Sequence, residues 1–152
     1  MFIYLFCADS AAIDPLGIEA FIEEGAYFDD DPGFYVNFGN HGWNKIEITP
    51  ATGQPPINIH RLTESQHINP YIQQAISALE EAGRAKKHAD LAAFLQHIQQ
   101  VFLFEIDNES LSDDVWEMLD NLEAWMAHER KGVVYVAGEG FYNADLNPIC
   151  KC

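Results

Sequence analysis

The chain has 152 residues, of which 24 are acidic and 8 are basic, so its formal net charge is −16. Because 48% of the residues are hydrophobic, there is enough apolar material for one core, and we expect a single globular domain over residues 1–152. The charge argues against nucleic acid as a partner, since phosphate binding needs a basic face. It argues against an anionic membrane surface for the same reason.

The compartment is indicated by the first residues and by the cysteines. The apolar run at residues 2–8 has no basic residues before it and stops at Asp9, so it is shorter than a leader or a membrane span and predicts a strand. Cys7, Cys150 and Cys152 form no disulfide framework, which is typical of a reducing compartment. We therefore expect a cytoplasmic protein of bacterial type that has no cofactor and no metal.

The first half of the chain predicts one helix followed by three short strands. Asp14 and Pro15 are a typical cap and first-turn pair, and Gly25 is a natural stop for the helix between them. Alternating apolar residues then predict strands at 34–38, 45–49 and 57–60, with loops at 39–42 and from Pro50 to Pro56. Such short strands favour an antiparallel meander, in which Phe34, Val36 and Phe38 share one face.

The second half predicts two helices and then a strand–helix–strand unit. Asn69-Pro70 indicates a helix start, Gly83 its end, and a second helix over about 86–100 would complete a helical hairpin. The apolar strands 101–106 and 133–137 flank a helix from Ser112 to just before Gly132, which favours a parallel crossover. A turn at 138–140 leads into a further short hairpin. The predicted fold is α/β mixed (α+β), with a central mixed sheet of about six strands.

Most of the acidic residues lie in two stretches that contain no lysine or arginine. Residues 9–31 hold eight acids and residues 105–129 hold nine, which together make 17 of the 24. A solvated surface that keeps the protein soluble would explain this pattern. A binding face for a basic partner would explain it as well, because such a charge speeds association with a cationic surface.

The predicted helix after Ser112 carries the candidate contacts for such a partner. Trp116 lies at the edge of its apolar arc beside a row of carboxylates, and tryptophan is a common anchor at interfaces. The candidate contact residues are Trp116, Asp113, Glu117, Asp120 and Glu123. The leading hypothesis is a non-enzymatic acidic protein that neutralises or sequesters a basic protein. In size, acidity and build it is similar to bacterial immunity or antitoxin proteins that cover a cationic nuclease groove.

The alternative hypothesis is a small-molecule-binding protein or an enzyme. Asp107 and Glu109 follow an apolar strand, where α/β folds place ligands, and His60 could join them. Asp and Asn are also ordinary loop residues before a helix, and the six histidines form no HxH or HxxxH pair. Cys7 fits a buried structural thiol better than a nucleophile.

A third hypothesis is a homodimer. Its subunits would pair through exposed aromatic residues, for which Tyr35, Trp43 and Tyr142 are the candidates on strands.

Overall fold

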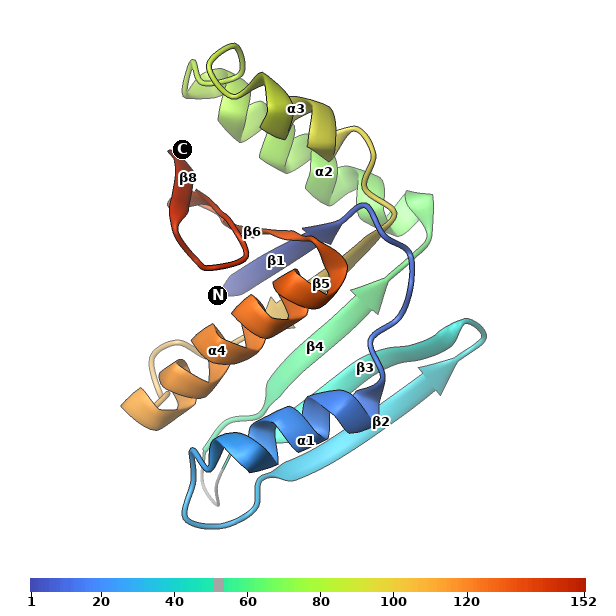
Figure 1. Cartoon of the computed structure of the whole chain (residues 1–152), viewed down its shortest axis with the longest axis vertical. Helices are drawn as coiled ribbons and strands as arrows, with labels where there is room; N and C mark the ends of the chain where they lie inside the picture. The colour runs from blue at the N-terminus through green and yellow to red at the C-terminus, as the bar shows by residue number, and fades with distance from the viewer. Residues whose placement is uncertain (51–53) are drawn as a thin grey trace.

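The computed structural model describes residues 1–50 and 54–152, so part of the predicted Pro50 to Pro56 loop lies outside the described residues. Within those ranges the chain forms four helices and eight strands (Figure 1). In chain order they are β1 (Phe2–Cys7), α1 (Pro15–Gly25), β2 (Gly33–Gly39), β3 (Gly42–Thr49), β4 (Ile57–Leu62), α2 (Ser65–Glu81), α3 (Ala89–Leu95), β5 (Gln100–Glu105), α4 (Asp113–Arg130), β6 (Val133–Val136), β7 (Gly140–Tyr142) and β8 (Pro148–Lys151). Across the same ranges, no helix combines the length and the apolar character that a membrane span needs.

The strands form one sheet in the order β2-β3-β4-β5-β1-β6-β7-β8, with antiparallel neighbours throughout. The α/β class and the meander are therefore as predicted, whereas the sheet has eight strands and is not mixed. β5 and β6 run in the same direction, but β1 lies between them and pairs with both. The two strands are parallel, as predicted, but they do not pair with each other. β4 and β1 already occupy the two edges of β5.

The helices cover the two faces of this sheet, and the alternation of side chains in β1 separates the two cores. Ile3 and Leu5 belong to the apolar cluster beneath α1 and α4, whereas Tyr4 and Phe6 belong to the cluster beneath α2 and α3. In Figure 1, α1 and α4 lie in front of the strands, and the α2–α3 hairpin lies at the top of the view, away from α1. Since β1 is buried on both faces, its unbroken apolar run is accounted for.

The predicted helix starts are confirmed in one case and wrong in another. The Asp14 carboxylate accepts a hydrogen bond from the Leu16 N–H at 3.0 Å, so α1 begins where the cap signal indicated. α2 instead begins at Ser65, and Pro70 lies inside the helix. Ile68 and Ile72 are buried on either side of Pro70, and their burial offsets the backbone hydrogen bond that proline removes. α3 is also shorter than the predicted 86–100 range.

Three polar side chains hold the segment that leads from β1 into α1. The Arg61 guanidinium donates to the Ser10 carbonyl, and the Gln100 amide donates to the carbonyls of Asp9 and Ala11. At the end of α4, Arg130 donates to the carbonyls of residues 11 and 12. These bonds anchor the start of α1 beside the end of α4, which sets the geometry of the face described next.

Candidate functional site

The two base-free acidic stretches are neighbours in the structure. The rings of Phe21 on α1 and Trp125 on α4 stack with centroids 5.0 Å apart and planes 17° apart. Figure 1 shows the two helices side by side over the same face of the sheet. The sequence left this placement open, because nothing in the pattern of either helix says which helix lies next to it.

The two helices are antiparallel, so most of the exposed acids gather at one end of the pair. Arg130 at the end of α4 bonds to the residues just before α1, whereas Ser112 and Asp114 at the start of α4 line a pocket with the turn after α1. That pocket has a volume of about 420 Å³ and includes Asp29, Asp30 and Asp31. We call the exposed acids at this end the acidic face, which comprises Glu23, Glu24, Asp29, Asp30, Asp31, Asp113, Asp114 and Glu117.

The five candidate contacts on α4 divide into three environments. Asp113, Glu117 and Asp120 are exposed, and Trp116 is half-buried against the core. Glu123 differs from the expected solvated row, because only 3% of it is exposed. The cause is helical geometry: position 123 follows Leu119 by one turn and precedes Met126 by three residues, so it faces the sheet.

Glu123 lies in a pocket between α4 and the strands β1, β6 and β7. The pocket has a volume of about 310 Å³, and we call it the Glu123 pocket. Its lining residues are Met1, Ile3, Trp116, Asp120, Glu123, Val134, Val136, Glu139, Tyr142 and Leu146. Within the described ranges, the Glu123 carboxyl has no hydrogen-bond or ion-pair partner.

Burial and a neighbouring acid both act on the protonation of Glu123. Removal from water is the larger cause and the negative charge of Asp120 is the smaller one, and together they raise the pKa of Glu123 to about 8. Burial also raises the pKa of Asp120. Glu123 is therefore mainly protonated at neutral pH unless a cation enters the pocket.

Glu139 and Tyr142 are members of this pocket that sequence reasoning did not connect with α4. The Tyr142 hydroxyl donates to the Glu139 carboxylate at 3.2 Å, and burial, followed by the charge of Glu139, raises the pKa of Tyr142. Glu139 lies outside both acidic stretches, in the glycine turn before β7. The turn predicted at 138–140, directly after the strand that follows α4, was the one signal in the sequence that could have placed Glu139 near this helix.

The alternative site residues are not brought together. Asp107 and Glu109 are exposed in the loop after β5, where the Asp107 carboxylate accepts from the Glu109 N–H at 3.3 Å, as in an ordinary turn. His60 projects from the middle of β4, and its Nε2 lies 3.6 Å from Oε1 of Glu105. Neither Asp107 nor Glu109 lines the Glu123 pocket, the pocket at the acidic face or the pocket that contains His60.

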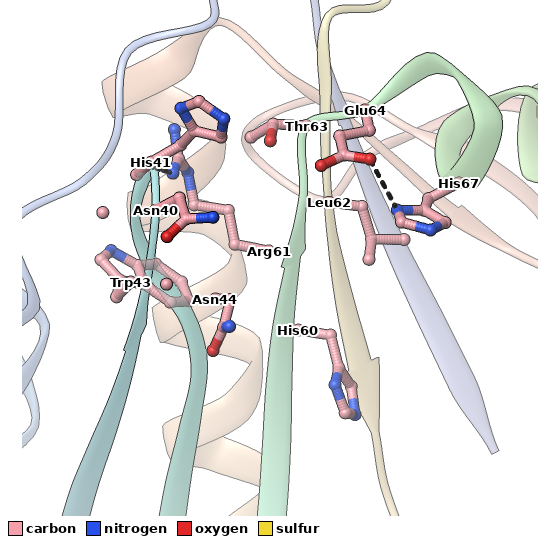
Figure 2. Close-up of a pocket in the computed structure, with 12 residues that line it drawn as sticks. Asn40, His41, Trp43, Asn44, His60, Arg61, Leu62, Thr63, Glu64 and His67 are labelled. Carbon is pink, nitrogen blue, oxygen red and sulfur yellow. Dashed lines mark hydrogen bonds and ion pairs between the residues drawn. The ribbon is translucent and has the colours of Figure 1, made fainter.

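The pocket that contains His60 lies where the β2–β3 turn approaches the end of β4, and its volume is about 420 Å³. Figure 2 shows that His41 comes from the turn, whereas His67 lies across the pocket at the start of α2, next to Glu64. Among residues 1–50 and 54–152, no three His, Cys, Asp or Glu side chains form a group that could hold a metal ion.

Cys7 and Trp43 are among the buried residues of the cluster beneath α1 and α4, whereas the other two cysteines and Tyr142 are not. Cys7 is buried, and desolvation, followed by the charge of Asp9, raises the pKa of its thiol to about 12, which disfavours a nucleophilic thiolate. The Sγ atoms of Cys150 and Cys152 lie 3.0 Å apart. Trp43 is part of the core, and its indole N–H donates to the Ile13 carbonyl at 2.7 Å. Tyr142 lies half-buried in the wall of the Glu123 pocket, as described above.

Two other aromatic residues are exposed on the outer strand β2. Tyr35 and Phe38 are both 67% exposed. The register shifts between Asn37 and Phe38, so Phe38 leaves the half-buried face that Phe34 and Val36 share. A homodimer that pairs through this edge stays a prediction.

Comparison of the chain with protein-family models, curated proteins and solved structures found no significant match. The acidic face and the Glu123 pocket are therefore the features of the chain that bear on its function.

Proposed function

We propose that the chain is a non-enzymatic binding protein whose acidic face engages a basic protein partner. The observation that carries this proposal is the antiparallel packing of α1 and α4, which joins two separate acidic stretches into one surface. The partner would be neutralised or sequestered, as in the immunity or antitoxin proteins with which the sequence shares its size and acidity.

The electrostatics of this surface favour a cationic partner. Carboxylates on α1, on the turn after it and on the first turns of α4 repel one another, and a basic surface placed over them would relieve that repulsion. Lys131, Arg130 and His128 lie at the far end of the helix pair, so they do not neutralise the acidic face. Such a surface also steers a basic protein during diffusion, which increases the association rate at low salt.

The test is charge reversal with a matched control. The triple variant Glu24→Lys, Asp113→Lys and Glu117→Lys changes the acidic face, whereas Glu80→Lys, Glu81→Lys and Asp90→Lys change exposed acids on α2 and α3 by the same total charge. Each variant is used to capture proteins from a lysate of the source cells at low and at high salt. We expect the wild type and the control to capture a basic partner. The amount captured by the first variant should be lower by at least about tenfold.

Two outcomes would contradict the proposal. If both triple variants lose the partner equally, net charge alone attracts it and the acidic face has no special role. If neither variant loses the partner and its binding does not weaken with salt, the surface described here is not the interface.

A further inference from the structure

Glu123 is unlike the other acids of the chain because it is buried and has no partner. A buried carboxyl group ordinarily has a hydrogen-bond donor or a cation beside it, since removing it from water is costly. Here the side chain is 3% exposed and its carboxyl group faces the Glu123 pocket. The environment of this carboxyl is thus incomplete on the pocket side, which is where a ligand group could complete it.

The walls of the pocket define the chemistry of that group. Ile3, Val136 and Leu146 provide apolar surface together with the ring of Trp116, whereas Asp120, Glu123 and Glu139 bring three carboxyl groups to the same space. Apolar walls suit a methylene chain, and carboxylates beside an indole ring suit a cation at the end of that chain. An anion would be repelled, and a wholly apolar ligand would leave Glu123 without a partner.

We propose that the Glu123 pocket binds an alkylammonium group, the end of a lysine side chain that the basic partner inserts beside Trp116. This inference rests on the proposed function and adds to it an anchor point, at the edge of the α4 row that also carries Asp113 and Glu117. The methylene chain packs on the apolar wall, and the ammonium group lies between Glu123 and the acids around it. A buried anchor of this kind contributes more to binding than exposed rim charges do.

The charged and titratable groups that face Glu123 come from three elements. Asp120 is on the same helix, Glu139 and Tyr142 lie across the pocket in the turn before β7 and in β7, and the amino group of Met1 precedes β1. The Met1 amino group donates to the Ile106 carbonyl at 3.0 Å and, within the described ranges, forms no ion pair with these acids. The pocket therefore keeps its excess of negative groups.

A rival ligand is a neutral acceptor that takes a hydrogen bond from protonated Glu123, and pH separates the two. A cation favours the carboxylate, so its affinity increases as Glu123 ionises toward its pKa of about 8. A hydrogen-bond acceptor favours the protonated acid, so its affinity decreases over the same range.

The experiment uses Nα-acetyl-lysine methylamide and its uncharged counterpart Nα-acetyl-norleucine methylamide as probes, with the full chain. Binding is followed by NMR, on the Trp116 indole N–H and on the side-chain carboxyl carbon of Glu123. We expect the lysine probe to bind at least about tenfold more tightly than the norleucine probe, and up to about tenfold more tightly for each pH unit between about pH 6 and 8.

Variants make the result specific to this pocket. Glu123→Gln keeps the shape of the protonated side chain and should weaken the lysine probe by about tenfold or more, whereas Glu80→Gln, on the exposed surface of α2, should leave it unchanged. Glu139→Gln, also exposed, serves as a second variant that does not disturb the core and should weaken the probe several-fold.

The inference is overturned if the two probes bind equally, if the Gln variants at 123 and 139 change nothing, or if affinity falls as the pH rises. Failure of the proposed function looks different. In that case the lysine probe still binds the pocket, but charge reversal of the acidic face does not affect capture of a basic protein.

Discussion

Arg61 and Glu123 are both ionisable side chains buried on the same side of the sheet, and their surroundings are opposite. Arg61 is 8% exposed, and its three nitrogens donate to Gln100 Oε1, the His41 carbonyl and the Ser10 carbonyl. Glu123 is 3% exposed, and no described residue bonds to its carboxyl group. The Arg61 guanidinium is therefore held by bonds within the fold, whereas the Glu123 carboxyl group is open to a pocket.

The difference shows how a buried ionisable group that stabilises the fold can be distinguished from one that is available to bind a ligand. Desolvation lowers the pKa of Arg61, yet a guanidinium stays charged near neutral pH and its neutral acceptors are fixed by the backbone. The bonds of Arg61 join the β2–β3 turn, β4 and the segment before α1. The Glu123 carboxyl group bonds to no described residue. Burying it in the ionised form therefore lowers the stability of the fold, and protonation or a bound ligand can restore that stability.

The largest effect is expected from breaking the Arg61 cluster at Gln100. Gln100→Leu removes the acceptor of the Arg61 Nε–H and the donor to the carbonyls of Asp9 and Ala11, while it keeps a similar side-chain volume. Leaving the buried Nε–H of Arg61 and the two part-buried carbonyls unpaired should lower the free energy of unfolding by about 3 kcal/mol, measured by urea denaturation.

The neighbouring Gln99 provides the control for this variant. Its side chain is exposed, so Gln99→Leu should change the free energy of unfolding by less than about 0.5 kcal/mol. An equal and small effect of both substitutions would mean that the Arg61 cluster does not stabilise the segment before α1.

The next effect concerns Glu123 and depends on pH. Its pKa is raised in the folded chain to about 8 from an ordinary value of 4.5, so the folded state holds this proton more tightly than the unfolded state does. The resulting stability is fully present below pH 4.5 and is lost as the pH rises through about 8. Glu123→Gln cannot ionise, so at about pH 9 it should be more stable than the wild type, by less than the roughly 5 kcal/mol to which the full pKa shift corresponds.

The comparison of two pH values isolates this effect. At about pH 4 the two proteins should differ by less than about 0.5 kcal/mol, because Glu123 is then protonated in both states. Glu117→Gln is the control, since this side chain is exposed and should show no such dependence. If the stability difference between Glu123→Gln and the wild type stayed constant from acid to alkaline pH, the carboxyl would not be held protonated by the fold.

Local signals in the sequence predicted much of this fold. Strong periodicity located the core of every helix, and the Asp14 cap located the start of α1. The order of the strands was not predictable in the same way, because it depends on contacts between strands that are far apart in the sequence. β1, for example, lies between β5 and β6. The predicted helix start at Asn69-Pro70 was wrong for a related reason. The burial of Ile68 and Ile72 outweighs the tendency of proline to interrupt a helix, so α2 begins before Pro70.

The site was less predictable than the fold. The acidic row on α4 followed from the helical period, and three of its four acids are exposed. The burial of Glu123 depends on how α4 is rotated against the sheet, and its proximity to Glu139 depends on a contact between distant parts of the chain. Gln100 gave no signal either, because its role comes from facing Arg61 across two neighbouring strands.

The smallest effect tests whether exposed charges behave differently from the two buried ionisable groups, Arg61 and Glu123. Glu117 has Asp113, Asp114 and Asp120 at the helical spacings of three and four residues. Glu117→Lys replaces three repulsions by attractions and should raise the free energy of unfolding by about 0.5 kcal/mol at low salt. Since these charges face water, the gain should vanish near 1 M salt, where the Debye length is about 3 Å.

Glu80→Lys on α2 is the matched control, because it changes the net charge equally but places the new lysine four residues before Arg84. It should give no gain at low salt. If both lysine variants stabilised the chain equally, the net charge of −16 would be what matters, and crowding on α4 would add nothing. If the gain at position 117 survived high salt, the carboxylates around it would be shielded from solvent, as Glu123 is. The acidic face would then resemble the Glu123 pocket more than an open surface.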